Sequence, residues 1–243
     1  GEAQKLCLDI NMMLGENAAL LYPEKEFVLA DAEAASREYE HKRIFALNAM
    51  LNGGCRAVIC SASAAAQLTI PPEDLKKRTI TLSGEDEISL EDLISRLTAA
   101  GYSRADLTEG AGQFSVRGGI VDVFPPNSTA PYRIELWGDS VDSLSEFDLE
   151  TQRRTATLDN IAVSPARETL FDSAEELCER IEALSKKPRG KKAEDIKSRL
   201  DEDVKKLRGG VELHSADRFF PLCYEEEATV FDYAERVFVC ENT

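Results

Sequence analysis

The clearest chemical pattern in the chain lies in the segment PYRIELWGD at residues 131–139. Alternation predicts a β-strand here, with Ile134 and Leu136 directed toward a core. The opposite face then carries Arg133, Glu135, Trp137 and Asp139. Solvated strand faces are usually rich in Lys, Glu, Thr and Ser, whereas Arg and Trp among charges are typical of the energetic centre of a protein-binding surface. The pattern therefore predicts a surface for a partner, with Arg133 and Trp137 about 13 Å apart.

Catalytic motifs are missing from the sequence. Neither of the two glycine-rich phosphate-binding patterns, G-x-x-x-x-G-K-[ST] and G-x-G-x-x-G, occurs. The two histidines, His41 and His214, are far apart, so a Ser/His or Cys/His pair has little to build from, and we expect them to be surface or packing residues. The six cysteines form no C-x-x-C pair, which argues against a zinc site and favours free thiols in a reducing cytoplasm. We therefore predict no catalytic residue, cofactor or metal in this chain.

The charge of the chain is strongly and unevenly negative. A net charge of -16 argues against sequence-independent binding of nucleic acid by the whole chain. Residues 185–210, however, hold ten Lys or Arg against five Asp or Glu. A DNA or intramolecular contact is one interpretation of this stretch, and a solvated helix with i,i+4 ion pairs is the one we favour. No apolar run approaches the roughly 18 residues that span a bilayer, and the N-terminus lacks a secretory signal, so we expect a cytoplasmic fragment of a longer protein.

The order of predicted elements indicates two kinds of architecture. Helices and short apolar strands alternate at first, as is typical of an α/β layer with a parallel sheet. From about residue 79 the pattern changes to strands with one Ser89-capped helix, and after Pro165 helices return. The predicted elements are helices at 2–15, 31–51, 62–68, 174–184 and 192–207, and strands at 18–23, 56–60, 79–82, within 112–154 and at 236–240. We therefore predict a small α+β domain, residues 79–164, inserted between two parts of an α/β domain, residues 1–78 and 165–243.

The strand-rich segment resembles a known family. It is similar to the second domain of the bacterial excinuclease subunit UvrB, and more closely to the matching module of the transcription-repair coupling factors (Mfd). The residues that carry the resemblance are FSVRGGIVDVFP at 114–125, PYRIEL at 131–136, DSL at 142–144, FD at 147–148 and QR at 152–153. Weaker similarity runs upstream to residues 22–23 and downstream through 165–168 to 219–222. The chain leaves no room after residue 23 for the aromatic hairpin with which UvrB clamps DNA, which favours the coupling factors.

The resemblance implies both a fold and a function. The fold is a degenerate P-loop-NTPase-like parallel sheet layer with an inserted, UvrB domain 2-like α+β domain. The function is recruitment of UvrA to a stalled RNA polymerase for nucleotide excision repair. Matching the family's UvrA contacts position by position gives Arg117, Arg133, Trp137 and Asp139, with Trp137 where relatives commonly have phenylalanine. ATP and Mg²⁺ would serve motor domains of the parent, whose parts outside this chain would bind RNA polymerase and double-stranded DNA.

Alternatives remain open for the function and for each residue. The chain could be a fragment of UvrB itself, an ATP-dependent enzyme that verifies DNA damage, or its UvrA surface could be masked in the full-length protein. Arg117 could form a structural salt bridge with Asp122 or Asp139, and a bulge at residues 118–119 would tilt it. Trp137 could instead cover the edge of the core, and the sequence around Asp139 is also typical of an Asx turn.

Overall fold

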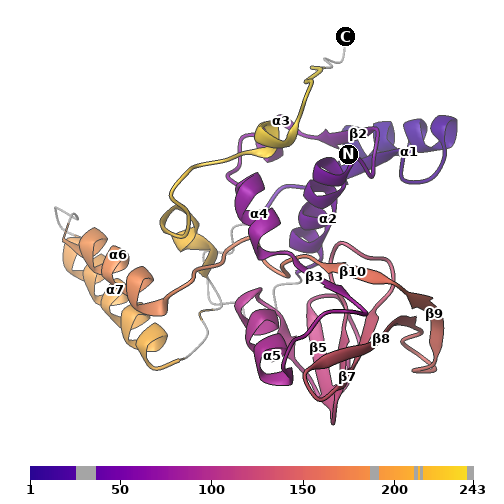
Figure 1. Ribbon diagram of the computed structural model, residues 1–243. Coiled ribbons are helices and arrows are strands. Elements are labelled where there is room, and N and C mark those ends of the chain that lie inside the picture. Colours follow the sequence, from indigo (N-terminus) through magenta and orange to yellow (C-terminus); the bar gives the residue numbers. More distant parts are fainter. Residues whose placement is uncertain (26–36, 187–191, 211–212, 214–215, 240–243) are drawn as a thin grey trace. The chain divides into compact units, whose positions relative to one another are not determined.

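The computed structural model describes residues 1–25, 37–186, 192–210, 213 and 216–239 (Figure 1). These residues divide into two compact units. The first takes residues 1–25, 37–168 and 228–239, and the second takes the described residues between 169 and 227. The chain is a mixed α/β protein with several sheets. The division into residues 1–78, 79–164 and 165–243 stays a prediction.

An α/β layer opens the first unit. Its elements are helices α1 (Glu2–Leu14) and α2 (Glu38–Asn52) and strands β1 (Ala19–Tyr22) and β2 (Ala57–Cys60). β1 and β2 pair in parallel, as predicted, and Ile44 and Leu47 of α2 are fully buried. α2 ends at Gly53, whose φ of 66° gives the left-handed conformation that glycine adopts without strain. The predicted helix at 31–51 overlaps α2, and its first residues, 31–36, lie outside the described residues.

Two short helices follow β2: α3 (Ala62–Ala65) and α4 (Pro72–Arg78). The Ser61 hydroxyl caps α3 by accepting a hydrogen bond from the amide of Ala64 at 3.1 Å. α4 is not among the predicted helices, and it begins at the second proline of the pair Pro71-Pro72. Proline is well suited to the first position of a helix, where its missing N–H group is not needed. The proline pair therefore begins α4, whereas α3 ends earlier, at Ala65.

The rest of the first unit is a β-rich domain built on a six-stranded sheet with the order β4-β5-β6-β7-β8-β9. Its elements are β3 (Ile80–Ser83), α5 (Leu90–Ala99), β4 (Ser103–Arg104), β5 (Gln113–Arg117), β6 (Ile120–Val123), β7 (Tyr132–Trp137), β8 (Ser140–Phe147), β9 (Arg154–Leu158) and β10 (Asn160–Val163). Neighbours are antiparallel from β5 to β9, β4 is parallel to β5, and β3 and β10 form a separate antiparallel pair.

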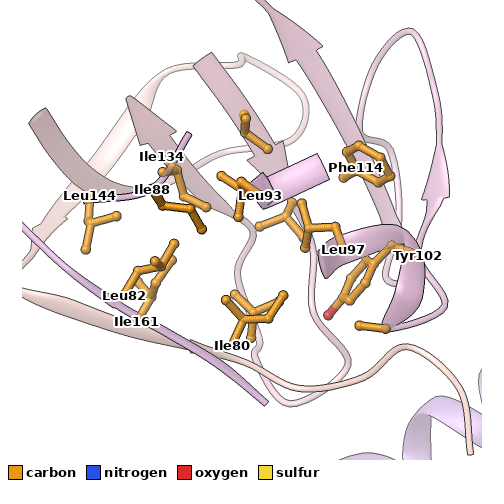
Figure 2. Packing of buried hydrophobic residues seen from close by; sticks show 14 of the residues in the cluster. Ile80, Leu82, Ile88, Leu93, Leu97, Tyr102, Phe114, Ile134, Leu144 and Ile161 are labelled. Atoms are coloured by element: carbon orange, nitrogen blue, oxygen red, sulfur yellow. The ribbon is translucent and has the colours of Figure 1, made fainter. Parts of the chain in front are cut away.

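The core of this domain lies between α5 and the two sheets. Leu93 and Leu97 of α5 pack with Ile134 of the large sheet, and Ile80 and Ile161 come from the small one (Figure 2). α5 begins where predicted, because the Ser89 hydroxyl accepts a hydrogen bond from the amide of Asp92 at 3.1 Å. One face of the large sheet is therefore fixed against α5 and the small sheet.

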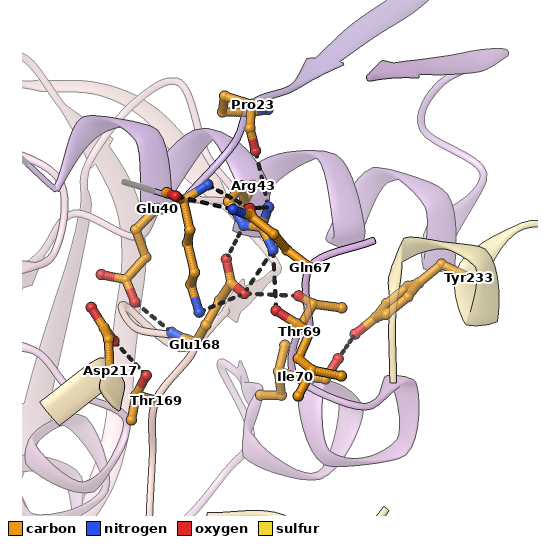
Figure 3. Close-up of polar contacts among 12 residues, drawn as sticks. Pro23, Glu40, Arg43, Gln67, Thr69, Ile70, Glu168, Thr169, Asp217 and Tyr233 are labelled. Atoms are coloured by element: carbon orange, nitrogen blue, oxygen red, sulfur yellow. Dashed lines mark hydrogen bonds and ion pairs between the residues drawn. The ribbon is translucent and has the colours of Figure 1, made fainter. Parts of the chain in front are cut away.

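A buried ionic cluster joins the end of the β-rich domain to the α/β layer (Figure 3). The Glu168 carboxylate accepts from Nε of Arg43 at 2.6 Å and from the Thr69 hydroxyl at 2.9 Å, and Nζ of Lys25 lies 3.2 Å from it. Arg43 also donates to the carbonyl of Pro23 at 2.9 Å. Burial alone would raise the pKa of Glu168, but Lys25, Arg43 and the hydrogen bonds from Arg43 and Thr69 together hold this pKa below its ordinary value.

The second unit is a helical hairpin with a short 3₁₀ turn. It consists of α6 (Ala174–Ser185), α7 (Ala193–Arg208) and η1 (Ala216–Leu222). Ser173 caps α6, as predicted, and Ile181, Val204 and Phe219 belong to a shared apolar core. The basic stretch shows both expected characters: Lys206 pairs with Glu202 one turn away at 3.1 Å on a mostly exposed α7, and Arg208 makes an intramolecular ion pair with Glu182 of α6 at 2.7 Å. Residues 187–191 of that stretch lie outside the described residues.

The prediction of a buried strand at 236–240 is wrong over its described part. The chain passes through η2 (Val230–Tyr233), and residues 236–239 form no strand. Phe238 is 84% exposed, and Val237 and Val239 are also exposed. None of the strands in the described part of the chain pairs with these residues, so their β-propensity has no sheet to join there. Residue 240 lies outside the described residues.

Candidate partner-binding surface

β7 separates two sets of side chains, as its alternation predicts. Ile134 is fully buried in the core, whereas Arg133, Glu135 and Trp137 share the opposite face. Across the sheet, Arg133 pairs with Asp122 of β6, and Glu135 pairs with Ser143 of β8. We call the surface formed by Arg117, Glu135, Trp137 and Asp139 the tryptophan face. It lies toward one end of the sheet, where β7 turns into β8.

Trp137 is the dominant apolar group of the tryptophan face. Its side chain is 83% exposed, so it does not cover the edge of the core. The side chain stands at the end of β7, directly before the two-residue loop Gly138-Asp139, where Gly138 has a φ of 62°. Exposing an indole without a partner is unfavourable in water, because its large apolar area stays hydrated. An exposed lone Trp on a sheet is therefore a candidate anchor for a partner.

The hairpin tip that carries Trp137 is fixed by a neighbouring segment. The amide of Ile88 donates to the carbonyl of Asp139 at 2.7 Å, and the amide of Val141 donates to the carbonyl of Asp86 at 3.0 Å. Asp139 is exposed, and its carboxylate makes no hydrogen bond with any described residue. Backbone pairing on both sides of the loop therefore holds the tip in one conformation while leaving the Asp139 carboxylate available.

Arg133 lies beneath the tryptophan face. Its Nε and one terminal nitrogen donate to the two oxygens of Asp122 at 2.6 and 2.8 Å, and the other terminal nitrogen donates to the carbonyl of Gln152 at 3.1 Å. The guanidinium also lies 4.7 Å from the centre of the Phe147 ring. The side chain is only 11% exposed, and its hydrogen bonds to Asp122 raise the pKa of Arg133. Three of its five N–H donors are thus used within the chain.

Arg117 remains accessible at the end of β5. Its side chain is 53% exposed, and one terminal nitrogen lies 3.4 Å from Oδ2 of Asp122, so one of the two predicted intramolecular partners is present at the limit of hydrogen-bond distance. The bulge predicted at residues 118–119 is not formed. Arg117 pairs directly with Ile120, and Gly118-Gly119 is a two-residue hairpin loop. The pairing of β5 with β6 therefore continues without a register shift up to Arg117, because the chain reverses direction entirely within the two-residue loop.

A polar layer that was not predicted from the sequence lies under the tryptophan face. Thr108, Ser115, Asp122 and Ser145 are buried, and the hydroxyls of Thr108 and Ser115 lie 3.0 Å apart. One feature of the sequence does indicate this layer: Asp122 interrupts the apolar run from Ile120 to Val123. A carboxylate buried in such a strand requires a cation as its partner. Arg133 is that cation. The remaining members depend on strand register, which the sequence pattern does not specify.

Comparison with known proteins defines the class of this domain. Residues 80–168 match the family described as the UvrB interaction domain. This range begins at β3 and ends at Glu168, and it contains the whole tryptophan face. We call residues 80–168 the UvrB interaction domain, after the family that they match.

The chain as a whole is similar to transcription-repair-coupling factors, which confirms the predicted resemblance. It is 30% identical to the Bacillus subtilis protein over 239 residues, which cover 96% of this chain and 20% of that protein. It is 26% identical to the Haemophilus influenzae protein over 90% of this chain and 19% of that one. Identity to the Staphylococcus epidermidis protein is 24%, over 97% of this chain and 20% of that one. The chain spans about a fifth of the length of these curated relatives.

The described part of the chain contains neither a group of metal-binding side chains nor a helix that could span a membrane. His, Cys, Asp and Glu side chains gather nowhere in it in a group that could hold a metal ion. None of the helices in that part combines the length and the apolarity that crossing a bilayer requires. His214 lies outside the described residues.

Proposed function

We propose that this chain is the module through which a transcription-repair coupling factor recruits UvrA, and that UvrA docks on the tryptophan face. The observation that carries the proposal is the exposure of Trp137 on a hairpin fixed at its tip. Large aromatic side chains with neighbouring arginines supply most of the energy in many interfaces. A fixed hairpin lowers the entropy lost on docking, because little of the surface must become ordered.

The four predicted contact residues then take different roles. Trp137 is the apolar anchor, and Arg117 and Asp139 offer exposed charges beside it. Arg133 acts from below as a positioning residue, because it is mostly buried and Asp122 and Gln152 accept hydrogen bonds from three of its N–H groups. In this proposal the chain is an interaction module without catalytic residues of its own.

The rest of the proposal concerns the parent protein. We propose that the α/β layer is a P-loop-NTPase-like sheet that has lost its nucleotide site, supported by the parallel pairing of β1 and β2. RNA polymerase and double-stranded DNA would be bound, and ATP with Mg²⁺ used, by parts of the parent outside this chain, in the bacterial cytoplasm. The names of the curated relatives favour a coupling factor over UvrB itself.

The proposal is tested by titrating the chain with purified UvrA in a calorimeter. Trp137→Ala should weaken binding at least tenfold, about 1.4 kcal/mol, because it removes the anchor. Phe238→Ala is the matched control, since Phe238 is an aromatic residue of nearly equal exposure, 84%, outside the UvrB interaction domain. Equal affinities for the two variants would overturn the site, and no binding by the folded wild-type chain would overturn the function.

A further inference from the structure

Arg154 at the start of β9 reaches the tryptophan face from the edge of the sheet. Its guanidinium forms an ion pair with Glu135 of β7, and one terminal nitrogen lies 3.4 Å from the hydroxyl of Ser143 on β8. The side chain therefore crosses β8 to lie on the same surface as Trp137. Arg154 was not among the contact residues predicted from the sequence, because its contact with Glu135 depends on the pairing of β7, β8 and β9.

The tryptophan face thereby carries two accessible arginines with similar geometry. Arg117 is 53% exposed and Arg154 is 45% exposed, and each rests on a less exposed carboxylate. Asp122 under Arg117 is fully buried, and Glu135 under Arg154 is mostly buried. The hydrogen bond from Arg154 is the main cause of the lowered pKa of Glu135, so this carboxylate is ionised at neutral pH. The carboxylates hold both guanidinium groups in place while their outer edges face solvent.

The charge of this spot differs from the charge of the chain. The whole chain carries -16, yet two partly exposed cations, Arg117 of β5 and Arg154 of β9, lie on the tryptophan face. Asp139 in the loop and Asp142 on β8 are exposed and set a negative border at the hairpin tip. A guanidinium presents a planar fork that matches a carboxylate. The complementary partner surface therefore has acidic side chains beside an apolar recess.

We propose that Arg154 is a specificity-determining contact of the tryptophan face, which binds a carboxylate of the docking protein. This inference rests on the proposed function, in which the docking protein is UvrA. Arg154 keeps its bond to Glu135 through one edge of the guanidinium and offers the other edge to the partner. Rim charges of this kind act mainly on the association rate and on its dependence on salt.

The first test compares Arg154→Ala with Arg153→Ala, which removes the same charge from the adjacent, exposed residue. Binding of UvrA is followed by stopped-flow or surface plasmon resonance between low and physiological salt. Arg154→Ala should lower the association rate about three- to tenfold at low salt, with a smaller effect at high salt, and Arg153→Ala should change it little. Thermal unfolding checks that both variants are folded. Equal behaviour of the two variants would overturn the inference.

A second variant separates partner contact from internal support. Glu135→Gln removes the counter-ion of Arg154 but keeps the guanidinium on the face. If Arg154 binds a partner carboxylate, Glu135→Gln binds UvrA at least as fast as the wild-type chain, since the arginine is freed. If the pair serves only the fold, Glu135→Gln and Arg154→Ala slow binding alike. If both variants slow binding alike while Trp137→Ala still weakens it, only the inference about Arg154 is overturned. If the wild-type chain does not bind UvrA, the proposed function is overturned as well.

Discussion

Asp122 holds two arginines from beneath: Arg117, which is on the tryptophan face, and Arg133, which lies below it. Its two oxygens bind Arg133 at 2.6 and 2.8 Å, and Oδ2 also lies 3.4 Å from Arg117. A buried carboxylate is tolerated only because these cations and their hydrogen bonds compensate for its lost hydration. A single carboxylate therefore fixes the position of one predicted contact residue and supports another.

Asp122→Asn should test this support directly. The amide keeps the shape of the side chain but leaves the largely buried Arg133 without its counter-charge, at a cost of about 2–3 kcal/mol in the free energy of unfolding. Urea denaturation measures the loss. Asp142→Asn, an exposed position on β8, is the control and should change stability by less than about 0.5 kcal/mol. A stability of Asp122→Asn equal to that of the control would show that the pair does not support the fold.

At the scale of elements, the β5–β6 hairpin approaches β7 unusually closely at Gly119. The amide of Leu136 donates to the carbonyl of Gly119 at 2.8 Å, and a Cβ added to Gly119 would lie 2.6 Å from the carbonyl oxygen of Leu136. That separation is well inside van der Waals contact. Glycine at this position therefore lets the loop beside Arg117 lie against the strand that carries Trp137.

Gly119→Ala should displace the hairpin from β7. We expect a loss of about 1–3 kcal/mol in the free energy of unfolding, as for other forced overpacking. Gly118→Ala is the comparison: its φ of 60° strains any other residue, but its Cβ would have open space, so we expect only about 1 kcal/mol. Chemical denaturation of both variants, with amide chemical shifts for β7, gives the ranking. The reverse ranking would contradict the close approach.

The elements differ in how far the sequence could predict them. The α5 and α6 starts were predictable, because Ser89 and Ser173 cap their helices through purely local hydrogen bonds. The strand predicted at 236–240 failed, because a strand exists only where another strand pairs with it. The same limit applied to the candidate surface. Alternation placed Arg133 and Trp137 on one face correctly, but only the register of β6, β7 and β8 shows that Arg133 is covered and Arg154 is not.

At the scale of the whole molecule, helix α2 meets the UvrB interaction domain at His41. A Cβ added to Gly112 would lie 2.9 Å from Nε2 of His41, so glycine is needed for this contact. Burial, with the charges of Arg37 and Arg167, lowers the pKa of His41 to about 4, although a backbone hydrogen bond at Ala166 opposes the shift. The histidine is therefore a packing residue, neutral at physiological pH.

His41 should make the stability of the chain depend on pH. Its ordinary pKa of 6.5 applies to the unfolded chain, so its stabilising effect is complete above pH 6.5 and is lost as the pH falls toward 4. The change is at most about 3 kcal/mol. The difference in unfolding free energy between the wild-type chain and His41→Gln, measured by urea denaturation from pH 7 to 4, should decline over this window. A difference that stays constant would show that His41 titrates normally.

Because of the Arg43–Glu168 cluster, excision of the UvrB interaction domain would affect the excised domain and the remaining α/β layer differently. Glu168 is the last residue of that domain, so a cut behind it carries the carboxylate away, where water can hydrate it at little cost. Arg43 and Lys25 stay behind in the α/β layer, and the hydrogen-bond acceptors that Arg43 keeps among the described residues, such as the carbonyl of Pro23, are neutral. The domain can thus be transplanted to another scaffold more readily than the layer can survive its deletion.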